Sequence, residues 1–273
     1  LKKAKASTIV QEGDPSNTTK TTEEDNAGPV DNTIASDNTE DTTAAGNDST
    51  TSGGGTTAQQ KQGMSKAEIL NIYKNAVNKV KNNAAAGYTK KEWQSLPELD
   101  IGTLGKILNP FIDRFMTQEA DAKEEINAKG SDEAKRRFPA CTLTDLSKIA
   151  TATCTESGGN YNIKIVMIDE KNPKESNNFL GQITNSVLYE ESIREEVDGL
   201  VLFGSPLVDK GYTFDITYNA FTITAKITKD GKFISLEHFA NVPIKADAKV
   251  AKIYNLNGTA RLENNCKYYD FKY

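Results

Sequence analysis

The stretch between residues 212 and 241 constrains the fold more than any other part of the chain. Apolar and polar side chains alternate from Tyr212 to Tyr218, and the alternation resumes one residue out of step at Phe221. Alternation with a period of two is typical of a half-buried strand, and a slip by one residue needs a bulge or a short turn. We interpret Asn219-Ala220 as a β-bulge that bends the strand. Asp230-Gly231, between two alternating runs, predicts a hairpin turn.

Residues 1–63 have a different composition from the rest of the chain. They contain no aromatic residue, no cysteine and very few aliphatic residues. Such a segment cannot bury enough apolar surface to offset about 1–2 kcal/mol per residue of backbone ordering. We therefore predict that residues 1–63 are a disordered low-complexity linker and that residues 64–273 form a single domain. As a flexible coil the linker would reach on the order of 45 Å.

The net charge of −5 is confined to this linker. Of the 33 basic and 38 acidic residues in the chain, residues 1–63 hold five and ten, which leaves 28 of each in residues 64–273. A neutral domain lacks the basic surface of a nucleic-acid-binding protein, so no nucleic-acid partner is expected. No run approaches the roughly 18 apolar residues that a membrane-spanning helix needs.

Helical signals precede strand signals along the chain. The capping box Ser65-x-x-Glu68 predicts an amphipathic helix of about twenty residues that ends at Gly87. Thr89-x-x-Glu92 predicts a second, shorter helix, and apolar spacing predicts a third from Ile101 to Met116. Pro110 should kink or split the third helix.

Strands dominate after residue 151. Gly158-Gly159 lies in a predicted hairpin turn, residues 183–197 are expected to be helical, and Asn257-Gly258 predicts another tight turn. Helices followed by antiparallel strands, without a βαβ rhythm, indicate an α+β fold. We predict N-terminal helices packed on a curved antiparallel β-sheet, preceded by a disordered tail.

No motif in the sequence points to catalysis or to a metal site. His238 is the single histidine, and strand alternation places it on the apolar face with Leu236 and Ala240. A packed core histidine is therefore expected, because no second ligand stands at metal-binding spacing. No nucleophile elbow, phosphate loop or calcium loop is present, and the paired glutamates are typical of solvated surfaces. No catalytic residue, metal ligand or cofactor is predicted.

The three cysteines are too widely spaced for a zinc site. Buried free thiols at Cys141, Cys154 and Cys266 are the first interpretation, because unpaired cysteine is often buried. A disulfide between Cys154 and Cys266, both in strand-like runs, is the alternative.

Aromatic side chains concentrated in the strands are the remaining candidates for a binding site. They could line an apolar pocket on a curved sheet, or they could form the core beneath the first helix. The candidate ligand-binding residues are Tyr212, Phe214, Tyr218, Phe221 and His238.

Several segments together resemble uncharacterised secreted proteins or lipoproteins of gut Firmicutes. The similarity covers most of residues 64–273 and is carried by Phe138-Pro139, Thr144-Asp145-Leu146, Ala152 to Thr155, Tyr161 to Ile165, Asp169 to Pro173, Asn219 to Ile227, Asp230-Gly231-Lys232 and the last strand. The resemblance implies an extracytoplasmic chain at the cell surface, tethered by a lipidated N-terminal cysteine. A helix on a curved sheet is also similar, at the level of fold, to bacterial lipoprotein carriers.

Three functions follow as hypotheses. The first is a non-catalytic binding or carrier domain for an apolar or amphipathic small molecule, or for a cell-surface partner, with membrane contact only through an N-terminal lipid anchor. The second is a secreted glycan-acting hydrolase that uses paired carboxylates. The third is a purely structural module of the cell envelope.

Overall fold

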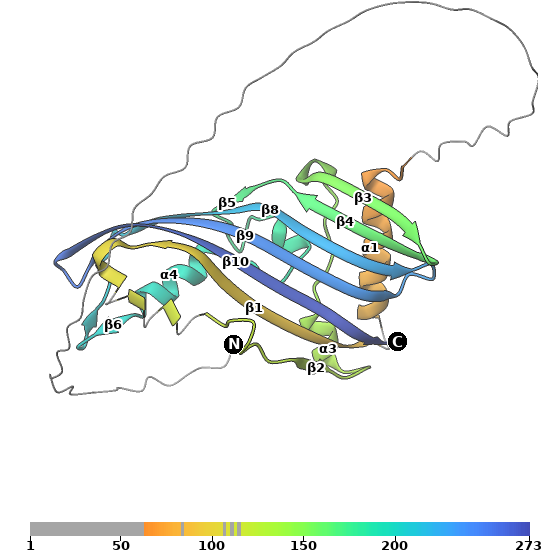
Figure 1. The fold of residues 1–273 in the computed structure, drawn as a ribbon, viewed down its shortest axis with the longest axis horizontal. Coiled ribbons are helices and arrows are strands. Elements are labelled where there is room, and N and C mark those ends of the chain that lie inside the picture. Colours follow the sequence, from red (N-terminus) through yellow and green to blue (C-terminus); the bar gives the residue numbers. More distant parts are fainter. Residues whose placement is uncertain (1–62, 83–84, 106–107, 110–111, 114–115) are drawn as a thin grey trace, which may run out of the picture. The chain divides into compact units, whose positions relative to one another are not determined.

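A large antiparallel sheet with few helices makes up the described part of the chain (Figure 1). The computed structural model describes residues 63–82, 85–105, 108–109, 112–113 and 116–273. The predicted disorder of residues 1–63 lies outside these residues, except for Gly63.

The strands differ widely in length. In chain order they are β1 (Gly87–Asp100), β2 (Glu125–Asn127), β3 (Ile149–Ser157), β4 (Asn160–Met167), β5 (Glu170–Lys171), β6 (Val201–Leu202), β7 (Ser205–Pro206), β8 (Thr213–Thr228), β9 (Phe233–Val250) and β10 (Tyr254–Lys272). Their order in the main sheet is β2-β1-β10-β9-β8-β4-β3, with β5 beside β8, and β6 and β7 form a separate hairpin. The three longest strands therefore lie side by side in the middle of the sheet.

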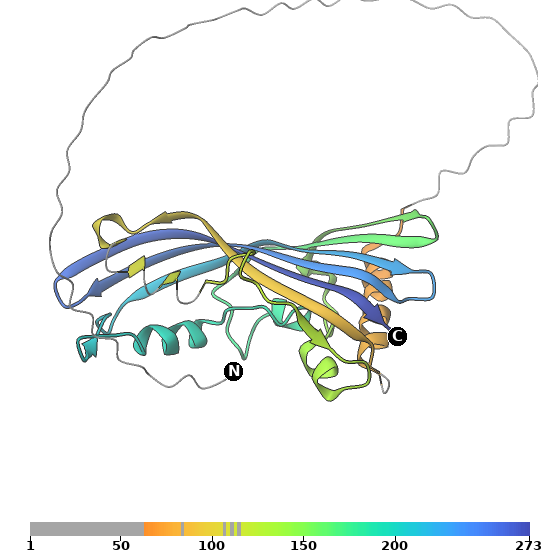
Figure 2. The ribbon, with the colours of Figure 1, turned by 60° about the horizontal axis from the view of Figure 1, so that its bottom comes forward.

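Of the helices whose bounds are described, only the first is long. They are α1 (Lys66–Lys81), α3 (Asp132–Arg137) and α4 (Glu190–Asp198), with 3₁₀ turns η1 (Gly102–Leu104), η2 (Leu146–Lys148) and η3 (Leu180–Gln182). In Figure 2 the three α-helices lie on one side of the twisted sheet. Helix α1 packs against β3, β4 and β8. The predicted α+β architecture is thus confirmed for α1, although strand structure dominates more than the sequence suggested.

The main core lies between α1 and the sheet. Ile69, Tyr73 and Val80 of α1 are fully buried, as are Ile165 of β4 and Ile223 of β8. Strands β4, β8 and β9 contribute alternate residues to this face, as is typical of a half-buried antiparallel sheet. Full burial of a large aliphatic side chain contributes about 1.5–3 kcal/mol, so this face supplies most of the driving force for folding.

The predicted bulge in β8 is confirmed. The pairing of β8 with β9 shifts between Asn219 and Thr222, and Ala220 has a φ of 47°. The backbone N–H of Ala220 donates a hydrogen bond of 2.9 Å to Asp169 Oδ1. This carboxylate fixes the bulge, and β8 continues through it as one strand.

Two predicted hairpins are also confirmed. Strands β3 and β4 pair from Ser157 and Asn160 outward, across Gly158-Gly159. Strands β8 and β9 are joined by the turn at Asp230-Gly231, where Gly231 has a φ of 78°. Both turns connect neighbouring strands, so local sequence signals specify them.

The start of α1 is confirmed, whereas its predicted end is wrong. Ser65 and Glu68 form the reciprocal capping box, but the helix ends at Lys81 and Gly87 begins β1. A Cβ atom on Gly87 would lie 2.7 Å from the backbone nitrogen of Lys129. Glycine is therefore needed there for the close approach of another segment and not as a helix cap.

The helix predicted at Thr89-x-x-Glu92 is wrong, because these residues belong to β1. Strand β1 pairs with β10 along its length and with β2 at its start. Glu92 forms an ion pair of 2.5 Å with Lys90 on the same face of the strand and does not cap a helix. Long-range pairing has overridden a local capping pattern.

Two further predictions need correction. Asn257-Gly258 lies inside β10, where Gly258 lets the end of β1 approach closely. The predicted helix at 183–197 is shorter and begins later, as α4. In the stretch predicted as a helix from Ile101 to Met116, η1 is followed by helical residues at 105, 108–109 and 112–113, and the predicted kink at Pro110 lies outside the described residues.

Candidate binding site beside strand β1

Three of the five aromatic candidates lie inside the main core. Tyr218, Phe221 and His238 expose at most 3% of their surface. The Tyr218 hydroxyl accepts a hydrogen bond of 2.6 Å from the backbone N–H of Leu188. A ligand-binding role for these residues stays a prediction, and a ligand would have to open the core to reach them.

His238 is held by neutral polar groups. Its Nδ1 atom lies 3.1 Å from the hydroxyl of Thr184, and its Nε2 atom lies 3.3 Å from the hydroxyl of Tyr73. Burial, followed by the positive charge of Lys90, lowers the pKa of His238 to about 3. The imidazole is therefore uncharged at neutral pH and joins α1, β9 and the loop at Thr184, as expected for a packed core histidine.

The other two candidates fasten α4 to the sheet. Tyr212 and Phe214 stack with ring centroids 6.2 Å apart, and the guanidinium of Arg194 lies 5.3 Å and 4.8 Å from their centroids. The Tyr212 hydroxyl donates a hydrogen bond of 3.1 Å to Asp198. The structure thus separates this pair, at α4, from the three core residues, and none of the five lines the two pockets described below.

All three cysteines are unpaired, as predicted, but only Cys266 is buried, whereas Cys141 and Cys154 are partly exposed. Cys154 on β3 and Cys266 on β10 are separated by β4, β8 and β9, so the alternative of a disulfide between them is wrong. Burial raises the pKa of the Cys266 thiol to about 12 and that of Cys141 to about 11. Neither thiol is a nucleophile at neutral pH.

Gln94 in strand β1 lines two pockets. The backbone N–H of Gln94 donates to the carbonyl of Thr117 at 2.7 Å, and its side-chain oxygen accepts from the N–H of Thr117 at 3.0 Å. These two bonds hold the segment around Thr117 beside the strand. A shift in the pairing of β1 with β10 between Ser95 and Glu98 accommodates Pro97.

The larger pocket, here called the Trp93 pocket, has a volume of about 700 Å³. Its apolar lining comes from Trp93, Leu96, Pro97, Leu99, Ile112 and Met116, and its polar lining includes Gln94, Gln118, Glu119, Glu263 and Asn265. The ammonium groups of Lys91 and Lys267 lie 5.8 Å and 5.4 Å from the Trp93 ring centroid. These cation–π contacts hold the indole against the sheet.

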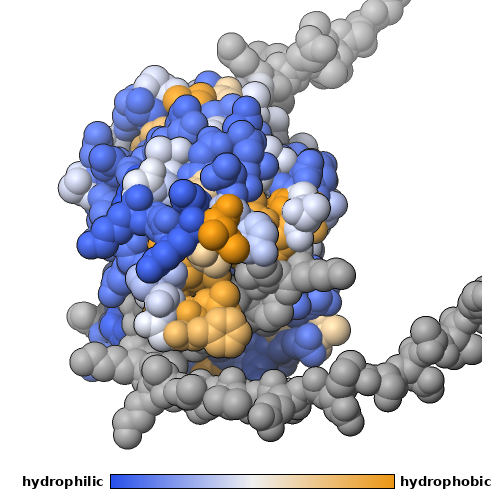
Figure 3. All heavy atoms as spheres, turned by 90° about the vertical axis from the view of Figure 1, so that its left-hand side faces the viewer, coloured by the Kyte–Doolittle hydropathy of each residue, from blue (hydrophilic) through white to orange (hydrophobic). Residues whose placement is uncertain are grey.

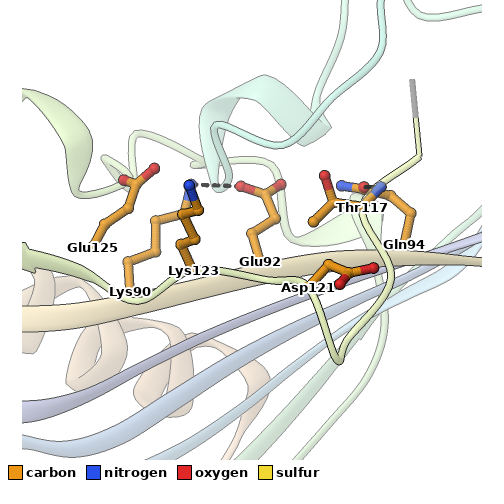
Figure 4. A pocket seen from close by; sticks show the side chains of 7 residues that line it. All are labelled: Lys90, Glu92, Gln94, Thr117, Asp121, Lys123 and Glu125. Carbon is orange, nitrogen blue, oxygen red and sulfur yellow. Dashed lines mark hydrogen bonds and ion pairs between the residues drawn. The ribbon is translucent and has the colours of Figure 1, made fainter. Parts of the chain in front are cut away.

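The smaller pocket, here called the charged pocket, has a volume of about 360 Å³ (Figure 4). It is lined by Lys90, Glu92, Gln94, Thr117, Asp121, Lys123 and Glu125. Figure 4 shows Lys90 and Glu92 side by side and joined by their ion pair.

The charges of this pocket are largely paired. Burial lowers the pKa of Lys90, but Cys266 and Glu92 outweigh that effect, so the net shift is upward. Glu125 forms an ion pair of 2.6 Å with Arg137. Among the described residues, no group of three potential metal ligands occurs.

No protein-family model matches the chain, and neither a curated protein nor a solved structure matches it. Of the described helices, none combines the length and the apolar character needed to cross a bilayer.

Sequence reasoning missed the Trp93 pocket because it assigned Trp93 to a helix. The pocket combines β1, the segment ending at Glu119, and β10, whose residues lie far apart in the sequence. Leu96-Pro97 was the available sequence signal for a strand at this position, because the residue before proline favours extended structure.

Proposed function

We propose that the folded part of the chain is a non-catalytic binding domain that holds an apolar or amphipathic small molecule in the Trp93 pocket. The observation that carries this proposal is the pocket itself, at about 700 Å³ with six apolar and eight polar residues in its lining. Pockets of roughly 300–1,000 Å³ with a mainly apolar lining and a few polar groups are typical of small-molecule sites.

The polar lining favours a ligand whose head group is cationic or donates hydrogen bonds. Glu263 is already engaged by Arg261 at 2.5 Å and by Ser95 at 3.0 Å. Asp113 and Glu119 form no ion pair with other described residues. In this proposal these two pocket-lining carboxylates bind the polar end of an amphiphile whose chain contacts Trp93.

Trp93 is the single tryptophan of the chain, so its fluorescence reports directly on this pocket. The test is titration of the full chain with dodecyltrimethylammonium and with dodecyl maltoside, each below its micellar concentration. We expect a saturable change in emission, with tighter binding of the cationic amphiphile. Leu99→Asn should weaken binding about tenfold through lost apolar burial.

Ile126→Asn is the matched control, because Ile126 is an exposed aliphatic residue on β2 outside the pocket. It should bind as the unchanged chain does. The proposal is wrong if neither amphiphile gives a saturable response, or if Leu99→Asn binds as tightly as Ile126→Asn. A structural module of the envelope would then be the better description.

We also propose that this domain works outside the cytoplasm, at the cell surface, on a lipid anchor. The support is the sequence resemblance and the composition of residues 1–63, which suits a spacer. Labelling of intact cells with a membrane-impermeant amine reagent should modify the chain, whereas labelling only after lysis would refute this location.

A further inference from the structure

Two neighbouring turns expose large apolar side chains at one end of the sheet. The turn between β6 and β7 carries Phe203, which is 98% exposed, next to Val201. The turn between β9 and β10 carries Ile253, which is 70% exposed, next to Tyr254. We call these four residues the apolar tip. Figure 3 looks at this end, where orange side chains lie among blue ones.

A small core separate from the main one fixes the two turns side by side. It consists of Leu104, Leu207 and Val250. The backbone N–H of Ala251 donates a hydrogen bond of 2.8 Å to the carbonyl of Leu207. Val208 and Val250 form an antiparallel bridge. The two turns that carry the apolar tip are therefore held in fixed positions relative to each other.

Backbone strain is concentrated at the same place. Of the six non-glycine residues with positive φ in the described chain, three lie in these turns: Phe203 at 49°, Ala251 at 50° and Lys252 at 66°. Each such conformation costs on the order of 1–3 kcal/mol and persists most often at functional sites. Asparagine would suit the position of Phe203 far better, since Asn-Gly is a preferred hairpin turn.

Two lysines stand in or beside the β9–β10 turn, and Asp209 lies next to one of them, because its backbone N–H donates a hydrogen bond of 2.8 Å to the carbonyl of Lys249. Lys252 lies within the β9–β10 turn, and Lys249 precedes it at the end of β9. Both are exposed, and among the described residues neither forms an ion pair. Tyr254 has an apolar ring and a polar hydroxyl, and tyrosine is enriched at the boundary between lipid and water.

We propose that the apolar tip inserts into the surface of an anionic lipid bilayer. A fully exposed large side chain offers about 200 Å², and of these four residues only Phe203 is almost fully exposed. The apolar tip therefore offers less than the roughly 800 Å² that each partner buries in a stable protein interface. Apolar side chains can insert into the hydrocarbon of a bilayer without a complementary groove. Lys249 and Lys252 would then form ion pairs with anionic lipid head groups. This inference is independent of the Trp93 pocket.

The test is flotation of the full chain with vesicles of phosphatidylcholine containing about one third phosphatidylglycerol. We expect binding that weakens in high salt and is much lower with pure phosphatidylcholine. Phe203→Asn combined with Ile253→Asn should reduce binding at least tenfold. Because asparagine tolerates a positive φ better than phenylalanine does, the urea midpoint of Phe203→Asn should stay equal to that of the unchanged chain or rise.

Ile126→Asn is again the matched control, since it removes an equally exposed apolar side chain far from the apolar tip. It should float as the unchanged chain does. The proposal fails if the unchanged chain does not bind anionic vesicles, if it binds neutral vesicles equally well, or if the double variant still floats. Self-association abolished by Phe203→Asn, without vesicle binding, would assign the apolar tip to a second copy of the chain and also overturn the proposal.

Discussion

His238 shows how one buried side chain can make stability depend on pH. The uncharged imidazole lies between Tyr73 and Thr184, and the rings of Phe221 and Tyr268 meet it edge to face, with centroids 5.5 Å and 5.8 Å away. None of these groups can stabilise an imidazolium by charge. Protonation at low pH therefore favours the unfolded chain.

Because the pKa of His238 is about 3 in the fold and about 6.5 when unfolded, this residue lowers the free energy of unfolding as pH falls from about 6.5 towards 3. The slope is at most about 1.4 kcal/mol per pH unit. His238→Gln keeps a donor and an acceptor but does not titrate. We expect it to be less stable than the unchanged chain at pH 7.5 and to approach it by pH 4.

Urea unfolding at several pH values measures this convergence. The carboxylates contribute equally to both proteins, so their effect cancels in the difference. Parallel stability curves for the two proteins would contradict the assignment of the low pKa to His238.

At the scale of elements, strand β1 depends on the close approach of the turn that follows β2. The backbone N–H of Gly130 donates a hydrogen bond of 2.7 Å to the carbonyl of Ala85, just before the strand begins. A Cβ atom on Gly87 would lie 2.7 Å from the nitrogen of Lys129 and 3.0 Å from the carbonyl oxygen of Asn127. Both are backbone atoms, which cannot rotate away.

Gly87→Ala should therefore lower the free energy of unfolding by about 1–3 kcal/mol, the usual cost of overpacking. Gly63→Ala is the control, because a Cβ atom there would meet nothing within 4 Å. The urea midpoints of the two variants measure the effect. Equal midpoints would show that the turn after β2 moves freely and that the contact is unimportant.

The elements that could be predicted from the sequence are those specified by neighbouring residues. The capping box at Ser65, the bulge at Asn219-Ala220 and the turn at Asp230-Gly231 each carry their own local signal. Strand β1 could not be predicted in this way, because its partner is β10. The turn between β9 and β10 could not be predicted either, because its positive φ angles fall on Ala251 and Lys252, and neither residue type favours that conformation.

The same distinction applies to the candidate site. Alternation correctly placed His238 beside Leu236 and Ala240 on the buried face, but it could not tell whether that face was a pocket or a core. The Trp93 pocket was beyond sequence reasoning because its walls meet only after β1 pairs with β10.

At the scale of the whole molecule, the described chain has two cores of very different size. The main core joins α1 to the sheet, whereas the small core at the apolar tip has Leu104, Leu207 and Val250 as its buried residues. Stability is commonly lowest where few apolar contacts are buried. The apolar tip should therefore open locally without unfolding of the main sheet.

Leu207→Ala should speed hydrogen exchange of the amides in residues 200–208 and 250–256 and leave β4 protected. Ile165→Ala, in the main core, should instead lower protection throughout, at a cost of about 2–5 kcal/mol. Exchange followed by mass spectrometry distinguishes the two patterns. If Leu207→Ala lowers protection in β4 as much as at the apolar tip, the two cores unfold as one unit.

The pairing of β1 with β10 also sets the order in which the protein can form during synthesis. The side chains of Glu92 in β1 and Asn264 in β10, which are hydrogen-bonded across these strands at 3.3 Å, are separated by 172 positions. At about 5–20 residues per second of translation, β1 waits roughly 10–30 s for its partner. During that time β1 has no partner strand. The charges of Lys90, Lys91 and Glu92 then discourage its association with other chains. The sheet can close only after nearly all of these 273 residues have been made.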